Sequence, residues 1–196
     1  MPLPRRDQPS GRFPVVQSMA GDSALVEKAL AGDRHSFELL VEKYYKVLFN
    51  GALRMVNDTE DARDIVQVTF LKAYEKLHTF KLEQKFFSWI YRIMFHESLN
   101  LLHRRKPRVD LPPTLEEPTS NPEEAYAENE LSVAISRALQ SLSHDNRLVV
   151  VLRHFLGLSY DEMSEILDIP EKTVKSRLFT ARRQLGVLLA DRRATT

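Results

Sequence analysis

Apolar side chains recur every three or four positions from Ser23 almost to the end of the chain, and no stretch alternates convincingly with a period of two. A spacing of three and four is typical of amphipathic helices, whereas alternation is typical of half-buried strands. The sequence therefore predicts an all-α protein. The expected helices are a short one before Gly32, one over 36–56, one after the turn at 57–59, an aromatic-rich one from Phe86, and four more after residue 130.

Two segments interrupt this pattern. Residues 1–22 are rich in proline, which disfavours a regular helix, so we expect a flexible leader there. Residues 109–130 contain four prolines and seven carboxylates but neither Lys nor Arg. Because proline and like-charge repulsion keep such a segment extended, we expect a flexible acidic linker over 108–129. It would join two small helical domains, at 23–107 and 130–196.

Composition and charge limit the class of protein. The 196 residues include no cysteine, which excludes disulfides and thiolate metal sites. The N-terminus lacks the apolar segment of a signal peptide, and no apolar run reaches the roughly 18 residues of a membrane span. We therefore expect a cytoplasmic protein without a membrane span. The net charge of +1 hides local clusters of basic residues, and these matter more for a polyanionic partner.

The helix expected after residues 57–59 has an unusual outer face. Its buried stripe includes Ala62, Ile65, Val66, Thr69, Phe70 and Ala73. Val68 and Leu71, however, fall among the solvated residues Asp61, Asp64 and Gln67. Apolar side chains in such a place indicate a surface that a partner covers. The alternative is that they are two scattered surface residues, which are common in folded proteins.

Aromatic and basic residues lie close together near the end of the first domain. Phe86, Phe87, Trp89, Tyr91 and Phe95 share one predicted helix, which runs into His103-Arg104-Arg105-Lys106. Most of the rings belong to the core. A basic helix end is usually solvated and favoured by the helix dipole. Together with the neighbouring aromatic rings, however, this basic end combines the two kinds of residue that bind nucleic acid. Cations bind phosphates, and rings stack on bases.

Residues 159–185 predict a helix-turn-helix. Ser159 and Glu162 form a capping-box pattern before a short helix, and Pro170 follows a tight turn and suits the start of a longer helix. Val174, Leu178, Ala181 and Leu185 mark the buried side of the longer helix. Its open side is suited to the major groove. The alternative is an amphipathic basic helix that only packs and keeps the protein in solution. The open side carries Lys172, Lys175, Ser176, Phe179, Arg182 and Arg183, with Thr180 at its edge.

Two of these segments resemble a known family. Residues 158–170, LSYDEMSEILDIP, with residues 173–182, TVKSRLFTAR, are similar to domain four of extracytoplasmic-function sigma factors of the sigma-70 family. Residues 61–74, DARDIVQVTFLKAY, resemble the polymerase-binding helix of domain two in the same family. The resemblance implies a protein that binds bacterial core RNA polymerase and directs it to promoter DNA. It also implies control by an anti-sigma factor and a part in a stress or envelope response.

The same resemblance implies roles for individual residues. Asp61, Asp64, Gln67, Val68 and Leu71 would bind the clamp coiled coil of the polymerase largest subunit. The acidic linker would thread through the polymerase. The minus-ten element would be contacted by Lys81, Phe86, Trp89, Tyr91, Arg92, His96, Asn100, Arg104 and Arg105. The minus-thirty-five element would be contacted by Lys172, Thr173, Lys175, Ser176, Phe179, Thr180, Arg182 and Arg183.

The chain departs from the family pattern at three places. His96 stands where relatives carry an Asn of the flipped-base pocket, which bears on base preference. Phe80-Lys81-Leu82 replaces Phe-Arg-Gly, so the loop there is stiffer. Thr180 stands where many relatives have Arg, which removes one cationic contact.

Three other functions would also use parts of this sequence. His96, Glu97 and His103 could suggest a metal enzyme, but their spacing is not that of His-Glu-x-x-His and no third ligand is evident. We therefore expect no enzyme activity, no cofactor and no metal. A stand-alone repressor or response regulator would share the helix-turn-helix and bind operators by itself. A basic scaffold protein would bind nucleic acid without regard to sequence.

Overall fold

The computed structural model describes residues 22–104 and 132–193, and the side chains up to Ala190. All regular elements in these ranges are helices, as the sequence predicted. In the first part they are α2 (Asp22–Leu30), α3 (Arg34–Val56), α4 (Thr59–Glu75), the short η1 (Leu77–Thr79) and α5 (Phe86–Arg104). In the second part they are a helix over 132–140, α7 (His144–Val150), η2 (Val151–Phe155), α8 (Tyr160–Leu167) and α9 (Glu171–Arg193).

Short polar side chains set the helix boundaries in the first part. Asp33 caps α3 and accepts hydrogen bonds from the His35 amide at 3.1 Å and the Ser36 hydroxyl at 2.7 Å. At the other end, Asn57 adopts the left-handed conformation with φ of 58° and closes α3. Asp58 then caps α4 by accepting from the Asp61 amide at 3.0 Å. The predicted turn at 57–59 is thus confirmed, and it works by the usual chemistry of helix caps.

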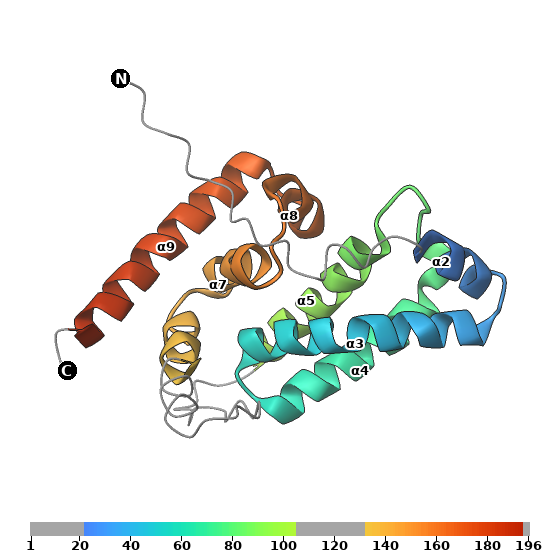
Figure 1. The fold of residues 1–196 in the computed structure, drawn as a ribbon, viewed down its shortest axis with the longest axis horizontal. Helices are drawn as coiled ribbons and strands as arrows, with labels where there is room; N and C mark the ends of the chain where they lie inside the picture. The colour runs from blue at the N-terminus through green and yellow to red at the C-terminus, as the bar shows by residue number, and fades with distance from the viewer. Residues whose placement is uncertain (1–21, 105–131, 194–196) are drawn as a thin grey trace, which may run out of the picture.

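The first part is a helical bundle in which α3 lies between α2, α4 and α5 (Figure 1). Leu40, Leu48, Val66, Phe87 and Ile90 are all essentially inaccessible to solvent and come from α3, α4 and α5. Such a core holds the three long helices at fixed angles because each buried side chain contacts several neighbours. The outer faces of α4 and α5 are therefore presented on a rigid support.

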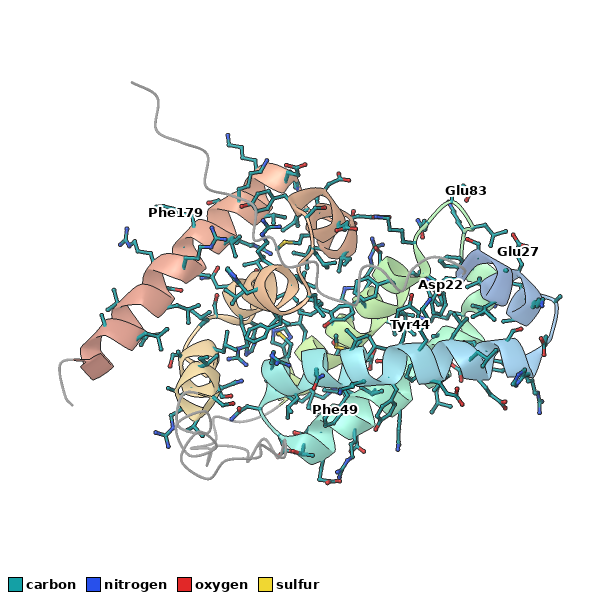
Figure 2. The ribbon with its side chains drawn as sticks, viewed as in Figure 1. Asp22, Glu27, Tyr44, Phe49, Glu83 and Phe179 are labelled. Carbon is teal, nitrogen blue, oxygen red and sulfur yellow. The ribbon has the colours of Figure 1, made fainter. Side chains whose placement is uncertain are left out.

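Asp22 corrects the predicted limit of the leader. The sequence placed it in the leader, but α2 begins at this residue and its side chain is buried. The carboxylate accepts hydrogen bonds from Lys43 Nζ and from the Tyr44 hydroxyl, both on α3 (Figure 2). A buried charge needs such partners, and here they fasten the start of α2 to α3. Leader residues 1–21 and the linker at 108–129 lie outside the described residues.

The second part is a smaller bundle closed by the helix-turn-helix. Leu148, Leu152, Leu158, Met163 and Val174 are buried and come from α7, η2, α8, α9 and the turn before α8. The sequence predicted only regular helices after residue 130. Instead, α7 gives way at Val151 to η2, a π-helical turn that ends at Phe155. Such turns insert one extra residue and redirect the side chains that follow.

The two parts pack against each other, which the sequence did not predict. Arg147 of α7 is 3% exposed and donates to Met55 O at the end of α3, as well as to the carbonyls of Leu139, Gln140 and Leu142. Beside it, Gln140 Nε2 donates to Arg54 O at 3.3 Å, and the Arg54 guanidinium lies 4.2 Å from the Phe155 ring centroid. Figure 1 shows α7 and α8 lying against α3 and α5.

Within the part of the chain that the structure describes, no helix combines the length and the apolar character that crossing a membrane requires.

The first bundle is packed so tightly around Gly51 that it leaves no space for a side chain at this position. A Cβ added there would overlap Tyr91 Oη and lie 2.9 Å from Tyr91 Cζ, both inside the core. We expect Gly51→Ala to lower the free energy of unfolding by about 1–3 kcal/mol, because the core must shift to accept it. Urea denaturation measures this. Gly186→Ala is the matched control, since a Cβ there meets nothing within 4 Å, and it should stabilise α9 by up to about 1 kcal/mol. Equal stability of the two variants would contradict the packing at Gly51.

Candidate nucleic-acid and partner interfaces

The outer face of α4 exposes the apolar residues that the sequence singled out. Leu71 is 64% exposed and Val68 is 36% exposed, and Asp64 and Gln67 beside them are exposed too. Asp61 differs from these four, because it lies partly buried in the first turn of α4 next to its capping residue. The sequence-predicted set thus shares one helix face, with Asp61 at its N-terminal edge.

Tyr74 extends this face and was missed by the sequence analysis. It lies on α4 one turn after Leu71, is 48% exposed, and packs edge-on against Phe37 with ring centroids 5.0 Å apart. The signal was available, because Leu71 and Tyr74 are three residues apart and neighbours on a helix share a face at that spacing. Lys72 belongs elsewhere, since its ammonium pairs with Glu97 of α5 at 2.6 Å.

A second surface follows α5 and the loop before it. Lys81 in the loop is exposed, and so are His96, Asn100 and Arg104. Trp89 is half-buried, with Phe80 and Phe86 at centroid distances of 5.3 Å and 5.7 Å. Arg105 lies outside the described residues. The remaining predicted residues, His96, Asn100 and Arg104, follow one another at intervals of four and so share one face of α5.

Phe86 and Tyr91 do not lie on this surface, and their predicted contact with DNA does not fit the structure. Phe86 is 3% exposed and Tyr91 is fully buried. Tyr91 points toward Gly51 of α3, and among the described residues its hydroxyl has no hydrogen-bond partner. The reason is helical geometry, because Tyr91 lies about 100° around α5 from Arg92 and turns inward when Arg92 turns outward. Burial raises the pKa of the Tyr91 hydroxyl.

A cavity of about 250 Å³ opens beside the loop at 81–85. Its walls come from the start of α2, the loop, and the start of α5, and Figure 2 shows Asp22 and Glu83 on the two sides. His96 is not among its lining residues. The cavity is lined by Asp22, Ser23, Val26, Phe80, Leu82, Glu83, Gln84, Lys85, Phe86 and Phe87.

Arg92 is partly buried because α8 lies over it. Its Nε donates to Ile166 O at 3.2 Å, and its NH2 group donates to Glu165 O. Lys85, which the sequence analysis did not select, pairs with Glu162 of the same helix at 2.9 Å. The predicted minus-ten surface is therefore occupied at one end by α8 of the second domain.

The helix-turn-helix has the predicted local structure. Ser159 Oγ accepts from the Glu162 amide at 3.1 Å, and Glu162 Oε2 accepts from the Ser159 amide at 2.9 Å, which completes the capping box. Asp168 closes α8 in the left-handed conformation with φ of 53°, a conformation that Asp tolerates better than most residues. Pro170 O accepts from the Thr173 and Val174 amides, so Pro170 immediately precedes α9. The turn fixes the direction of α9.

The open face of α9 is exposed to solvent over most of its length. Phe179 is 69% exposed and projects away from the body of the protein (Figure 2). Lys175 pairs with Glu171 one turn earlier, and Arg182 Nε donates to His154 Nε2 at 3.3 Å. Thr173 is partly buried, whereas the rest of the predicted set is exposed. The exposed residues are Lys172, Lys175, Ser176, Phe179, Thr180, Arg182 and Arg183.

Two family models match the chain in the same order. The model described as "Sigma-70 region 2" matches residues 40–108, and that described as "Sigma-70, region 4" matches residues 132–185. The matches therefore run from Leu40 within α3 to the end of α5 in the first domain, and in the second they cover the helices up to Leu185 in α9.

Similar proteins extend over most of the chain. The RNA polymerase sigma-H factor of Pseudomonas aeruginosa is 34% identical over 182 residues, covering 86% of this chain and 93% of that protein. The ECF RNA polymerase sigma-E factor of Escherichia coli (strain K12) is 36% identical over 173 residues, covering 82% and 90%. The chain belongs to the extracytoplasmic-function sigma factors of the sigma-70 family. As a sigma factor it directs RNA polymerase to promoters and is not an enzyme.

Solved structures share the fold of this sigma factor. CnrH, solved in complex with the cytosolic domain of CnrY, is 26% identical and superposes with a TM-score of 0.69 over 87% of this chain and 97% of CnrH. The sigma factor RpoE of Bartonella quintana, solved with the anti-sigma factor NepR, is 23% identical with a TM-score of 0.62 over 79% and 96%. The match to CnrH spans both domains of this sigma factor.

Tyr91 and Tyr44 form a matched pair that tests the burial of Tyr91. Tyr91→Phe removes a buried hydroxyl without a partner among the described residues, so the free energy of unfolding should stay the same or rise by up to about 1 kcal/mol. Tyr44→Phe removes a hydrogen bond to the buried Asp22 carboxylate and should cost about 1–3 kcal/mol. Urea denaturation of both variants measures the difference. A larger loss for Tyr91→Phe than for Tyr44→Phe would contradict this assignment.

His154 should make the stability of the second domain depend on pH. Partial desolvation by neighbouring residues and the positive charges of Arg182 and Arg153 lower the pKa of His154 from its usual value of 6.5, although the side chain still reaches solvent. Because the folded pKa is lower than the unfolded one, the contribution of His154 to stability is complete above pH 6.5 and is lost as the pH falls toward the folded pKa. His154→Gln should therefore show a smaller loss of thermal stability between pH 7.5 and 5.5. Equal losses of thermal stability for the unmodified protein and for His154→Gln would contradict this assignment.

Proposed function

We propose that this sigma factor uses three separate surfaces, the outer face of α4 for core polymerase, the α5 surface for the minus-ten element and the open face of α9 for the minus-thirty-five element. The observation that carries the proposal is the exposure of Leu71 and Val68 on α4 beside Asp64 and Gln67. Apolar residues that stay exposed on a rigid helix while the core is complete favour a surface that a partner covers.

For the minus-ten element, the cations and rings along α5 and in the loop before it support contact with opened DNA. Lys81 and Arg104 would neutralise phosphates, and Trp89 would offer part of its ring to a base. The cavity beside the loop at 81–85 is a candidate place for a base removed from the stack, since the exposed residues Glu83, Gln84 and Lys85 in its walls can form hydrogen bonds with a base edge. Removing a base costs a few kcal/mol, which a fitted pocket offsets.

For the minus-thirty-five element, α9 presents donors along a helix of the size that the major groove admits. Lys172, Lys175 and Arg182 would contact phosphates or guanine edges, and Ser176 can contact several bases. Phe179 would pack against a thymine methyl group or a sugar. The carboxylate of Glu171 holds Lys175 in place in the absence of DNA.

The proposal includes a protein inhibitor. The solved relatives CnrH and RpoE are each bound to a partner, and the RpoE partner is named as an anti-sigma factor. We expect an anti-sigma factor here that covers part of the α4 face, and hence a role in a stress or envelope response. Since the polymerase is its target, this sigma factor would act in the cytoplasm.

Transcription with purified bacterial core polymerase tests the proposal directly. Promoter fragments from the genome of origin should give specific run-off transcripts only when the protein is added. If no transcripts appear and the protein does not co-elute with core polymerase, the proposal is wrong. A stand-alone DNA-binding regulator would then be the preferred interpretation.

Variants on two surfaces should separate the two domain functions. Asp64→Ala combined with Leu71→Ala should weaken co-elution with core polymerase and leave minus-thirty-five recognition unchanged, because both side chains lie on the α4 face. Lys175→Ala should weaken minus-thirty-five recognition by about 1–3 kcal/mol and leave co-elution unchanged. Leu30→Ala, which also removes an exposed leucine but from α2, is the control for the first variant. Exchange of the two effects would show that the domain assignment is wrong.

A further inference from the structure

The cavity beside the loop at 81–85 has an exposed apolar residue at its mouth. Leu82 is 46% exposed, although the deeper walls of the cavity are made of buried side chains. An exposed leucine beside a hollow favours a surface that another segment covers. The volume of about 250 Å³ lies below the roughly 300–1,000 Å³ of pockets for drug-sized ligands, so the cavity suits one side chain or one base. Its exposed lining residues, which form its rim, are Ser23, Leu82, Glu83, Gln84 and Lys85.

The rim also has a carboxylate that is open to a cation. Glu83 is exposed, projects from the loop (Figure 2), and forms no ion pair with another described residue. The other charged residues of the lining, Asp22 and Lys85, each pair with an oppositely charged residue. A segment that covers the rim would therefore be held best by a cation beside Glu83 and an apolar side chain beside Leu82.

The leader, residues 1–21, is joined to the chain in the wall of this cavity, because α2 begins at Asp22 and Asp22 lines the cavity. Residues 12–16 of the leader read Arg-Phe-Pro-Val-Val, and Phe13 is its only aromatic residue. Phe13 precedes Asp22 by nine residues, which span at most about 30 Å when extended. A segment on so short a tether has an effective concentration on the order of millimolar, so even a weak contact forms.

The order of residues in the leader matches the order at the rim. Arg12 and Phe13 are adjacent in the sequence, as are Leu82 and Glu83. Because Pro14 biases Phe13 toward an extended backbone, the segment can lie along two adjacent rim residues. The leader has three arginines and one aspartate, so its net charge is opposite to that of Glu83. Charge and apolar character thus agree on the same pairing.

We propose that leader residues 12–16 dock on this cavity, with the Phe13 ring against Leu82 and the Arg12 guanidinium paired with Glu83. The proposed function gives the same cavity to a base of the minus-ten element, and the competition between leader and base rests on that function. In the free protein the leader covers the cavity, and a base that enters the cavity displaces the leader. The leader thus lowers the affinity for opened DNA according to the fraction of molecules that it closes.

The opposite role for the leader is direct contact with DNA, because arginines also bind phosphates. The two roles have opposite signs in a binding assay with the full chain. The probe is a fluorescent single-stranded oligonucleotide with the non-template minus-ten sequence from the run-off promoters, and its binding is followed by anisotropy.

We expect Phe13→Ala and Arg12→Ala each to tighten binding of the oligonucleotide about two- to fivefold, as when the leader closes between about half and four fifths of the molecules. Leu3→Ala is the matched control, because it removes an apolar side chain from the leader outside the docking segment, and it should leave the affinity unchanged. Weaker binding by Arg12→Ala, or unchanged binding by Phe13→Ala, would overturn the proposal.

Disulfide formation tests docking without DNA. The chain has no native cysteine, so Val15→Cys combined with Gln84→Cys places one thiol in the docking segment and one at the rim. We expect intramolecular oxidation of this pair to slow about threefold or more when Phe13→Ala is added, because the tether alone then brings the thiols together. Adding Leu3→Ala instead should leave the rate unchanged.

Equal oxidation rates with and without Phe13→Ala would overturn the proposal whether or not the protein supports transcription. The expected slowing in a protein that gives no run-off transcripts would support the docking and refute only the proposed function.

Discussion

The arrangement of the two domains depends on how arginines meet the ends of helices. Arg147 reaches from the second domain to Met55 O at the end of α3, and it also donates to carbonyls at the end of the helix over 132–140. In the opposite direction, Arg92 reaches from the first domain to the last turn of α8. A helix end has carbonyls without partners, and a guanidinium has five donors in a fixed plane, so each satisfies the other. The domains are thus joined by polar contacts that run both ways.

This kind of interface suits domains that must also act apart. A large apolar interface would leave hydrophobic surface exposed when the domains separate, whereas helix-end carbonyls and arginines can be hydrated. Leu40, Leu48 and Ile90 of the first domain and Leu148, Met163 and Val174 of the second are buried, and they belong to one continuous apolar cluster. When the domains separate, the two surfaces proposed to contact DNA can be set at the spacing that a promoter requires.

The sequence predicted what depends on local periodicity and local caps. The turn at 57–59, the capping box at Ser159 and the buried side of α9 follow from rules that operate within a few residues. Tyr91 was misplaced because a helix crowded with rings offers several possible inner faces. Gly51 could have indicated that Tyr91 is buried, since a glycine inside a long helix can mark the close approach of another element. The π-turn at Val151 has no comparable signature in the sequence. The contacts of Arg147 have none either, because every backbone carbonyl can accept a hydrogen bond from an arginine.

Glu162 links the fold of the helix-turn-helix to the contact between domains. Its Oε2 accepts from the Ser159 amide and completes the cap of α8, while its Oε1 accepts from Lys85 of the first domain. Burial acts to raise the pKa of this carboxyl, but the hydrogen bonds from Lys85 and Ser159 lower it overall. The two oxygens thus serve two purposes that do not compete. When Lys85 leaves, the cap remains and α8 stays intact, so opening the domains does not require unfolding the element that positions α9.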